Sequence, residues 1–384
     1  MGLDKFLREE VQDYISQHQH YDITKILFTK SPFADITIQE LAQQLKGKKT
    51  AEKKFPFLDV AGIVFPPNLN LEQASSQATA DYKSKLFAGE HLLDLTSGFG
   101  IDAFWLGKGF SEITLVERNT ELLNIVKHNW HILSSKKTHY INGSLEDFLK
   151  TNNQQYSMVY LDPARRDEHN RKKFLLEDLS PNLLEVKDEI LQFTSRLVVK
   201  LSPLMDISML ITQLPEIKEI YIIAVKNEVK ELLLVIEKAY KGEVDLTCVN
   251  LESTDSEFNF CYSELKQNVY GYSSSDKYLY LPNHAVLKSG AFNLLSQRFS
   301  LHKLDVNTHF YTSANLYQDF PGRVLEVQMV DAKAISKNEK YNIISKNYPL
   351  TPEQIKKKYK IKDGGKQYLI FTQAQGKKVI LKSN

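Results

Sequence analysis

The amino-acid sequence predicts an α/β protein built on a doubly wound, mostly parallel sheet. Short runs rich in Leu, Ile and Val alternate with helix-length segments from about residue 91 onward, as in successive βαβ units. These runs are apolar almost throughout, which is typical of strands that helices cover on both faces. The first run leads directly into a glycine-containing turn, and such turns bind ligands in folds of this class.

Six apolar runs form the expected central sheet: residues 91–97, 112–118, 138–142, 158–162, 196–201 and 219–225. A seventh run, 231–237, follows after five residues, and only an antiparallel hairpin fits so short a link. A parallel sheet that ends in one antiparallel hairpin resembles the Rossmann-like sheet of class I methyltransferases. It differs from the all-parallel sheet of nicotinamide-binding proteins.

The chain is longer than one hydrophobic core usually organises, so several domains are expected. Residues 1–80 carry apolar side chains at helical spacing and predict a helical N-terminal region. The sheet predicts a cofactor-binding domain over residues 81–240, and the polar stretch that follows has no clear pattern.

Short strands and helices then predict a small α+β module, divided into residues 268–310 and 311–384. Its expected helices are residues 284–299 and 351–359, the second with Thr351 as its cap and Pro352 at its first position. Its expected strands are residues 277–281, a strand near 309, and residues 323–330, 367–372 and 377–381.

Charge is distributed unevenly along the chain. Residues 333–384 contain thirteen Lys, no Arg and three acids, a balance of 13 − 3 = +10, which leaves −8 for the remainder of a chain with net charge +2. A basic terminal segment attracts the phosphate backbone of nucleic acids. A solvated, lysine-rich surface without such a partner explains the same composition.

Nothing in the sequence predicts a membrane, secretory or metal-binding protein. No apolar run approaches the roughly 18 residues of a membrane span, and the N-terminus lacks a signal-peptide core. Cys248 and Cys261 stand in no CxxC motif, and His128 and His131 have no matching acid or thiol motif. We therefore expect a soluble cytoplasmic protein with free thiols and no metal.

The glycine turn is the strongest candidate site. Gly98 and Gly100 allow a tight turn and close approach of a ligand to the backbone. With Ala103 they also fit the dinucleotide fingerprint GxGxxA, so the glycines alone leave both cofactors open. Asp94, four residues before Gly98, favours S-adenosylmethionine, because an acid there pairs with the methionyl ammonium group and repels a pyrophosphate.

Four further residues complete the candidate cofactor site. Glu117 lies nineteen residues after Gly98, where an acid accepts both ribose hydroxyls of an adenosine. Ser97 belongs to the turn itself. Asp102 either assists the methionyl end or only favours the helix dipole. Ser144 occupies the position of an adenine contact, for which Asp147 is the substitute if it is not simply a helix-start residue.

The candidate catalytic residues follow the fourth apolar run. Asp162 is the first candidate, because open α/β sheets place their chemistry at the carboxyl ends of strands. Pro163 fixes the backbone so that Asp162 and nearby carbonyl groups can accept hydrogen bonds from an amino group. Arg165 and Arg166 are expected to meet a phosphate, although such a pair also fits a solvated loop.

Five motifs carry a resemblance to a known family. They are LDLTSGFGID (93–102), LDPAR (161–165), YLYLPNH (278–284), DFPGR (319–323) and KDGG (362–365). The chain resembles bacterial methyltransferases with a C-terminal THUMP-like domain. This resemblance implies a Rossmann-like S-adenosylmethionine domain, a ferredoxin-like segment and RNA binding. EQASSQ (72–77) is similar to a family segment that lines the cofactor, although it also fits a helix start.

The methylated atom is less well specified. Amine-methylating enzymes commonly carry Asp/Asn-Pro-Pro and an aromatic residue, whereas Ala164 and Arg165 follow Pro163 here. Methylation at a pyrimidine C5 needs a cysteine nucleophile, and neither cysteine lies in a motif. A base nitrogen of RNA is the favoured acceptor. The alternatives are a methyltransferase of a protein or small molecule, and an RNA-binding protein with an inactive cofactor site.

Overall fold

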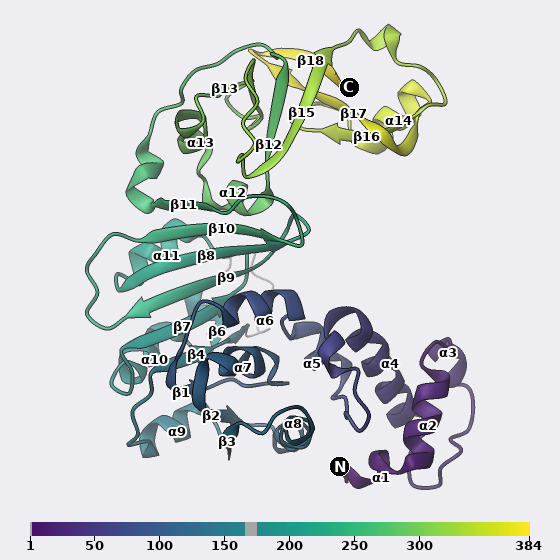
Figure 1. Ribbon diagram of the computed structural model, residues 1–384, viewed down its shortest axis with the longest axis vertical. Helices are drawn as coiled ribbons and strands as arrows, with labels where there is room; N and C mark the ends of the chain where they lie inside the picture. Colours follow the sequence, from purple (N-terminus) through teal and green to yellow (C-terminus); the bar gives the residue numbers. More distant parts are fainter. Residues whose placement is uncertain (1, 166–174) are drawn as a thin grey trace. The chain divides into compact units, whose positions relative to one another are not determined.

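The computed structural model describes residues 2–165 and 175–384 (Figure 1). The chain forms two compact units, residues 1–217 with 233–241 and residues 218–232 with 242–384. The finer division expected at residues 80, 240 and 310 stays a prediction. In the part of the chain that the structure describes, no helix is long and apolar enough to cross a membrane.

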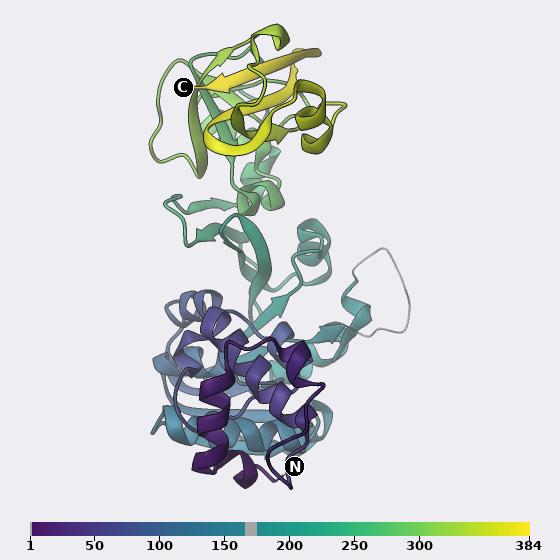
Figure 2. The same ribbon diagram turned by 90° about the vertical axis from the view of Figure 1, so that its right-hand side faces the viewer.

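The N-terminal region is helical, as predicted (Figure 2). Its longest helix, α4, begins with a capping box in which the Thr37 hydroxyl accepts from the Glu40 amide and the Glu40 carboxylate accepts from the Thr37 amide. Leu41 and Leu45 of α4 are fully buried. The six helices are α1 (Asp4–Leu7), α2 (Glu9–His18), α3 (Ile23–Ile26), α4 (Ile38–Lys54), α5 (Asn68–Gln73) and α6 (Gln77–Ser84).

Among the described residues of the first unit, five parallel strands follow the order β7-β4-β1-β2-β3. The chain places β2 and β3 on one side of β1 and then crosses to the other side for β4 and β7. Ligands bind beside the carboxyl ends of the strands at such a switch point in the strand order. The strands are β1 (Gly89–Asp94), β2 (Phe110–Glu117), β3 (Lys137–Asn142), β4 (Met158–Leu161) and β7 (Arg196–Leu201). The accompanying helices are α7 (Ile101–Leu106), α8 (Thr120–Leu133), α9 (Leu145–Thr151), α10 (Leu183–Ile190) and α11 (Ile207–Gln213).

The expected hairpin is formed by β8 (Ile217–Val225) and β9 (Glu228–Glu237), which are neighbours in the sheet. Lys226 and Asn227 link them, and both have positive φ, 49° and 65°, as a type I′ hairpin turn requires. The hairpin and the parallel strands confirm the predicted fold class.

Two strands were missed in the polar stretch after residue 240. β10 (Asp245–Leu251) pairs with β8 in parallel, and β11 (Phe258–Cys261) pairs with β10 in the antiparallel direction. In β10 the polar side chains of Asp245, Thr247 and Asn250 interrupt the buried apolar ones. Without a continuous apolar run, the segment did not show the pattern of a buried strand.

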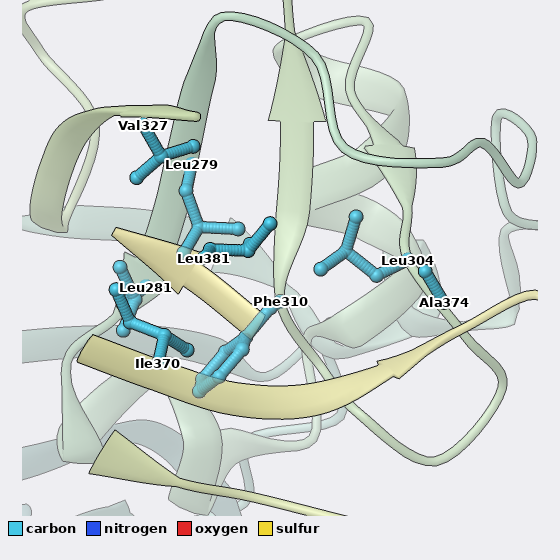
Figure 3. Packing of buried hydrophobic residues seen from close by; sticks show 8 residues of the cluster. All are labelled: Leu279, Leu281, Leu304, Phe310, Val327, Ile370, Ala374 and Leu381. Atoms are coloured by element: carbon cyan, nitrogen blue, oxygen red, sulfur yellow. The ribbon is translucent and has the colours of Figure 1, made fainter. Parts of the chain in front are cut away.

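The remainder of the second unit is built on a seven-stranded sheet in the order β13-β14-β12-β15-β18-β17-β16. These strands are β12 (Tyr278–Pro282), β13 (His302–Lys303), β14 (Tyr311–Ser313), β15 (Gly322–Met329), β16 (Lys340–Ser345), β17 (Lys362–Ala374) and β18 (Lys377–Ser383). Leu279, Leu304, Phe310, Ile370 and Leu381 belong to its core (Figure 3). The small α+β module is thus confirmed, while β16 was not anticipated.

The single helix expected near residues 284–299 is two helices, α12 (His284–Ser289) and α13 (Phe292–Arg298). Gly290 ends α12 in the left-handed conformation with φ 78°, which favours glycine at a helix end. The helix expected after Thr351 is α14 (Pro352–Tyr359), and Thr351 and Gln354 form its capping box. Its buried residue Ile355 packs with Tyr341 and Phe371 of the sheet.

Candidate functional site

The carboxyl ends of β1 and β4 bring two predicted acids to one edge of the sheet. Asp94 ends β1 and lies in register with Tyr160 of β4, two residues before Asp162. Thr96 joins the two segments: its amide donates to Asp94 Oδ1 at 2.9 Å, and its hydroxyl accepts from the Asp162 amide at 2.7 Å. The glycine turn and the end of β4 therefore form one hydrogen-bonded edge.

The glycine turn has the backbone conformation that its sequence predicted. Gly98 and Gly100 have φ of 52° and 74°, in the left-handed region where glycine carries no penalty. A Cβ atom at Gly100 would lie 3.0 Å from Val126 Cγ1 and 3.1 Å from Trp130 Nε1. At Gly98 the nearest atom to such a Cβ is the Thr96 carbonyl oxygen, 3.8 Å away. Gly100 thus packs against α8, whereas Gly98 leaves room for a ligand.

Asp94 and Ser97 have chemistry that suits the methionyl end of S-adenosylmethionine. Asp94 is 1% exposed, and burial raises the pKa of its carboxyl to about 8, against the opposing effect of the Thr96 amide. A ligand ammonium group would stabilise the ionised form. The Ser97 hydroxyl is buried without a hydrogen-bond partner among the described residues. Both groups therefore favour a polar, cationic ligand beside the turn.

Glu117 is held at the end of β2 by two backbone amides. Its Oε2 accepts from the Gly98 amide at 3.0 Å, and its Oε1 accepts from the Asn119 amide at 2.8 Å. A carboxylate has about four acceptor positions, so each oxygen can still accept from a hydroxyl. The structure places Glu117 beside the glycine turn, and its ribose contact stays a prediction.

Ser144 caps helix α9. Its hydroxyl accepts from the Asp147 amide at 3.1 Å and donates to Asp147 Oδ2 at 2.8 Å, while the Asp147 side chain is largely exposed. Both candidates for the adenine contact therefore belong to one helix start. The adenine contact of Ser144, or of Asp147 in its place, stays a prediction.

Asp102 is the centre of a buried polar cluster that the sequence analysis did not anticipate. We name it the Asp102 cluster; its members are Ser75, Lys83, Asp102, Tyr160 and Lys200, none more than 9% exposed. The carboxylate lies 2.7 Å from Lys83 Nζ and 3.3 Å from Lys200 Nζ. It also accepts from the Ser75 hydroxyl at 2.7 Å and from the Tyr160 hydroxyl at 2.9 Å.

The Asp102 cluster keeps its central carboxylate ionised. Burial raises the pKa of Asp102, but Lys83 and Lys200 outweigh burial and hold the pKa below its ordinary value. Asp102 is thus an ionised group that pairs with two lysines, and it does more than favour the helix dipole. Its direct contact with a cofactor stays a prediction. Ser75 lies in the segment 72–77 that was expected near the cofactor, whereas Lys83 was missed.

Asp162 forms an ion pair with Lys200, whose Nζ lies 2.5 Å from Asp162 Oδ2. The Asp162 side chain is 34% exposed, and Pro163 beside it is buried. The next two residues form β5 (Ala164–Arg165), which pairs with β6 (Leu179–Ser180). The side chain of Arg165 and the whole of Arg166 lie outside the described residues, so their expected phosphate contact stays a prediction.

Three family models match separate parts of the chain. Residues 77–191 match the model of conserved hypothetical protein 95, residues 278–321 a ferredoxin-like domain, and residues 323–382 a THUMP domain-like model. The first match runs from α6 to α10 and includes every candidate cofactor-binding and catalytic residue, from Asp94 to Arg165. The other two cover the small α+β module.

Two similar proteins bear on the function. A crystal structure of a candidate methyltransferase from Porphyromonas gingivalis W83 aligns with a TM-score of 0.86 and 29% identity, over 99% of this chain and 98% of that chain. A protein of Mycoplasma mobile described as an uncharacterised RNA methyltransferase is 25% identical over 198 residues. That alignment covers 47% of this chain and 51% of the relative, so the chain spans about half the length of this curated protein.

Proposed function

Because this chain carries a class I, S-adenosylmethionine-dependent methyltransferase domain and a THUMP-like C-terminal domain, we propose that it methylates RNA at a base nitrogen. The predicted resemblance to methyltransferases with a THUMP-like domain is confirmed. The choice of RNA is supported by the described activity of the Mycoplasma mobile relative and by the basic C-terminal region.

The observation that carries the cofactor assignment is the buried Asp94 carboxyl beside the open glycine turn. In this proposal Asp94 pairs with the methionyl ammonium group, Ser97 supplies a further hydrogen bond, and Glu117 accepts from the ribose hydroxyls. When bound, S-adenosylmethionine would supply an electrophilic methyl group; the acceptor nitrogen would bond to this carbon in line as the carbon–sulfur bond breaks and S-adenosylhomocysteine leaves. The protein then contributes mainly position and electrostatics.

Asp162 is the proposed acceptor-side residue. Its carboxylate is partly exposed at the carboxyl end of β4, close in the fold to the turn that holds the cofactor. It can accept a hydrogen bond from an N–H group of the base and so orient the nitrogen lone pair. Pro163 keeps the backbone of this segment in place.

The two cysteines are poorly suited to nucleophilic catalysis at a pyrimidine carbon. Burial raises the pKa of the Cys248 thiol to about 12. A hydrogen bond to Asp245 is the main cause that raises the pKa of Cys261. Only the thiolate is an effective nucleophile, so both thiols are inactive near neutral pH. This chemistry favours a nitrogen acceptor, which needs no covalent enzyme intermediate.

The C-terminal lysines offer a surface for the RNA backbone. Of the thirteen lysines in residues 333–384, eleven are exposed, and Lys356 and Lys382 are partly buried. We define the α14 lysine cluster as Lys340, Lys357, Lys358, Lys360 and Lys362; Lys340 and Lys362 are register partners on β16 and β17. Such a group neutralises phosphates and releases their counterions.

Calorimetric titration with S-adenosylmethionine and with NADH tests the cofactor assignment. Saturable binding of S-adenosylmethionine, its loss in the Asp94→Asn variant and no binding of NADH are expected. Transfer of a labelled methyl group to RNA, digested to nucleosides, then identifies the acceptor atom. Tighter binding of NADH would overturn the proposal, and transfer to protein in place of RNA would support the alternative substrate class. Binding of RNA without S-adenosylmethionine would indicate an RNA-binding protein.

A further inference from the structure

Two buried lysines stand where an apolar core would be expected. Lys83 is fully buried and Lys200 is 9% exposed, and the desolvation of an ammonium group costs several kcal/mol even after relaxation of the protein. Apolar side chains of similar volume often stabilise a core as well as a buried ion pair does. Titratable groups buried beside a candidate site therefore favour a functional role.

The contacts of Lys200 fix its ammonium group in one orientation. Nζ lies 2.5 Å from Asp162 Oδ2, 3.1 Å from Ser75 Oγ and 3.3 Å from Asp102 Oδ2. An ammonium group has three N–H donors, so these acceptors provide a partner for each. Lys200 thus connects the buried Asp102 with the partly exposed Asp162.

Lys83 and Ser75 hold this arrangement from the other side. Lys83 Nζ lies 2.7 Å from Asp102 Oδ1 and donates to Ser75 Oγ at 3.1 Å. The Ser75 hydroxyl accepts from both lysines and donates its own proton to Asp102. Two ammonium groups therefore face two carboxylates, and the Ser75 hydroxyl, from the segment before α6, bridges both lysines to Asp102.

The two ammonium groups of the cluster balance the charges of two carboxylates, Asp102 and Asp162. Lys83 compensates Asp102, and Lys200 is then available to compensate Asp162 at the shorter distance. The contact with Lys200 engages Oδ2 of Asp162, while about a third of the side chain remains exposed. An incoming N–H group can therefore reach a carboxylate whose orientation is already set.

We propose that Lys200 is a positioning residue, which orients the Asp162 carboxylate toward the acceptor and is itself held by Lys83, Asp102 and Ser75. This inference rests on the proposed function, because it assigns Asp162 to the acceptor side of the methyl transfer. Lys200 acts through Asp162 and contacts no reacting atom. Pre-orientation matters because a misplacement of about 1 Å at a reacting centre lowers the rate by roughly a hundredfold.

The test compares Lys200→Met with a matched control, Lys187→Met. Lys187 has the same side-chain exposure, 10%, and forms ion pairs with Glu216 at 3.1 Å and with the exposed Asp188 at 2.6 Å, but it lies on α10 outside the Asp102 cluster. Thermal unfolding of both variants measures the cost of losing a buried lysine together with its ion pairs. Calorimetry with S-adenosylmethionine measures the cofactor site, and steady-state methyl transfer to RNA separates kcat from KM.

For Lys200→Met we expect a Kd for S-adenosylmethionine within about threefold of the parent and a kcat lowered about a hundredfold with little change in KM. Lys200→Arg should recover part of kcat, since it restores a cation beside Asp162. Lys187→Met should lose stability but keep kcat. An unchanged kcat in Lys200→Met would overturn the inference, and so would a loss of cofactor affinity as large as the loss of kcat.

Crystal structures of the parent and of Lys200→Met, both with S-adenosylhomocysteine, give a readout that needs no RNA. The expected result is a displaced or disordered Asp162 carboxylate in the variant with an unchanged glycine turn. An unmoved Asp162 would overturn the inference. If the parent binds the cofactor but methylates no RNA, the proposed function fails, and these structures still decide whether Lys200 positions Asp162.

Discussion

Replacing Asp94 by asparagine tests whether this buried carboxyl is neutral until a cationic ligand arrives. Asparagine keeps the shape of the protonated acid and can still accept from the Thr96 amide, which lies 2.9 Å from Oδ1. It removes only the ability to ionise. The variant should therefore fold like the parent and differ from it in how stability and cofactor binding depend on pH.

The direction of the effect follows from proton binding in the two states. The pKa of Asp94 rises from 3.8 to about 8 on folding because the side chain is 1% exposed. Between these values the folded state holds a proton that the unfolded chain has released, so stability falls as pH rises. At about 1.4 kcal/mol per pKa unit, the whole shift corresponds to roughly 6 kcal/mol, of which about 4 are lost between about pH 5 and about pH 8.

Urea unfolding without cofactor at about pH 5 and about pH 9 measures this difference. Relative to the parent, the Asp94→Asn variant should gain about 4 kcal/mol of unfolding free energy between the two conditions. Calorimetry in buffers of different ionisation enthalpy adds a second measurement: binding of S-adenosylmethionine near pH 7 should release about one proton in the parent, because the ammonium group ionises Asp94. Parallel pH dependences of stability, or binding without proton release, would refute the reasoning.

Three further predictions concern other parts of the site. Gly100→Ala should destabilise the fold by about 1–3 kcal/mol in urea unfolding, since the added Cβ would lie 3.0 Å from Val126 Cγ1 at φ 74°; unchanged stability would mean that the turn adapts. Glu117→Ala should weaken S-adenosylmethionine binding about tenfold in calorimetry, because two backbone amides and the ribose lose their acceptor; an unchanged Kd would exclude the ribose contact. Lys357→Ala with Lys358→Ala should lower RNA affinity and reduce the salt dependence of binding by about 1–2 in log–log slope. The exposed pair Lys377 and Lys378 is the matched control: it begins β18 and lies in register with the last two residues of β17, whereas Lys362 begins β17. An equal effect there would argue against the α14 lysine cluster as the specific surface.

The parts of the fold that the sequence predicted well are those in which one local signal decides the outcome. Continuous apolar runs predicted β1, β2, β4 and β7, because burial on both faces leaves no room for alternation, whereas β3, at the edge of the sheet, has no buried residue. Thr351 and Pro352 predicted the start of α14 by the same local logic. β10 and the break at Gly290 were missed, since polar interruptions and a single glycine are weak signals within short elements.

In the candidate site too, local sequence signals predicted some residues and missed others. Asp94 and Gly98 follow each other at a fixed spacing around one turn, so the sequence sufficed to bring them together. The Asp102 cluster instead depends on Ser75 and Lys200, which are 125 residues apart and meet only in the folded chain. A lysine in a helix such as α6 usually faces solvent, and nothing in the sequence distinguished Lys83 from such a residue.

The two hydrogen bonds of Thr96 affect the order in which the substrates bind. Its amide holds the Asp94 carboxyl and its hydroxyl holds the Asp162 amide, at 2.9 Å and 2.7 Å, so one residue connects the region proposed for the cofactor with the region proposed for the acceptor. Ionisation of Asp94 strengthens the first of these bonds and thereby restrains the second. We therefore expect an ordered reaction in which S-adenosylmethionine is the leading substrate, RNA follows, and S-adenosylhomocysteine leaves last.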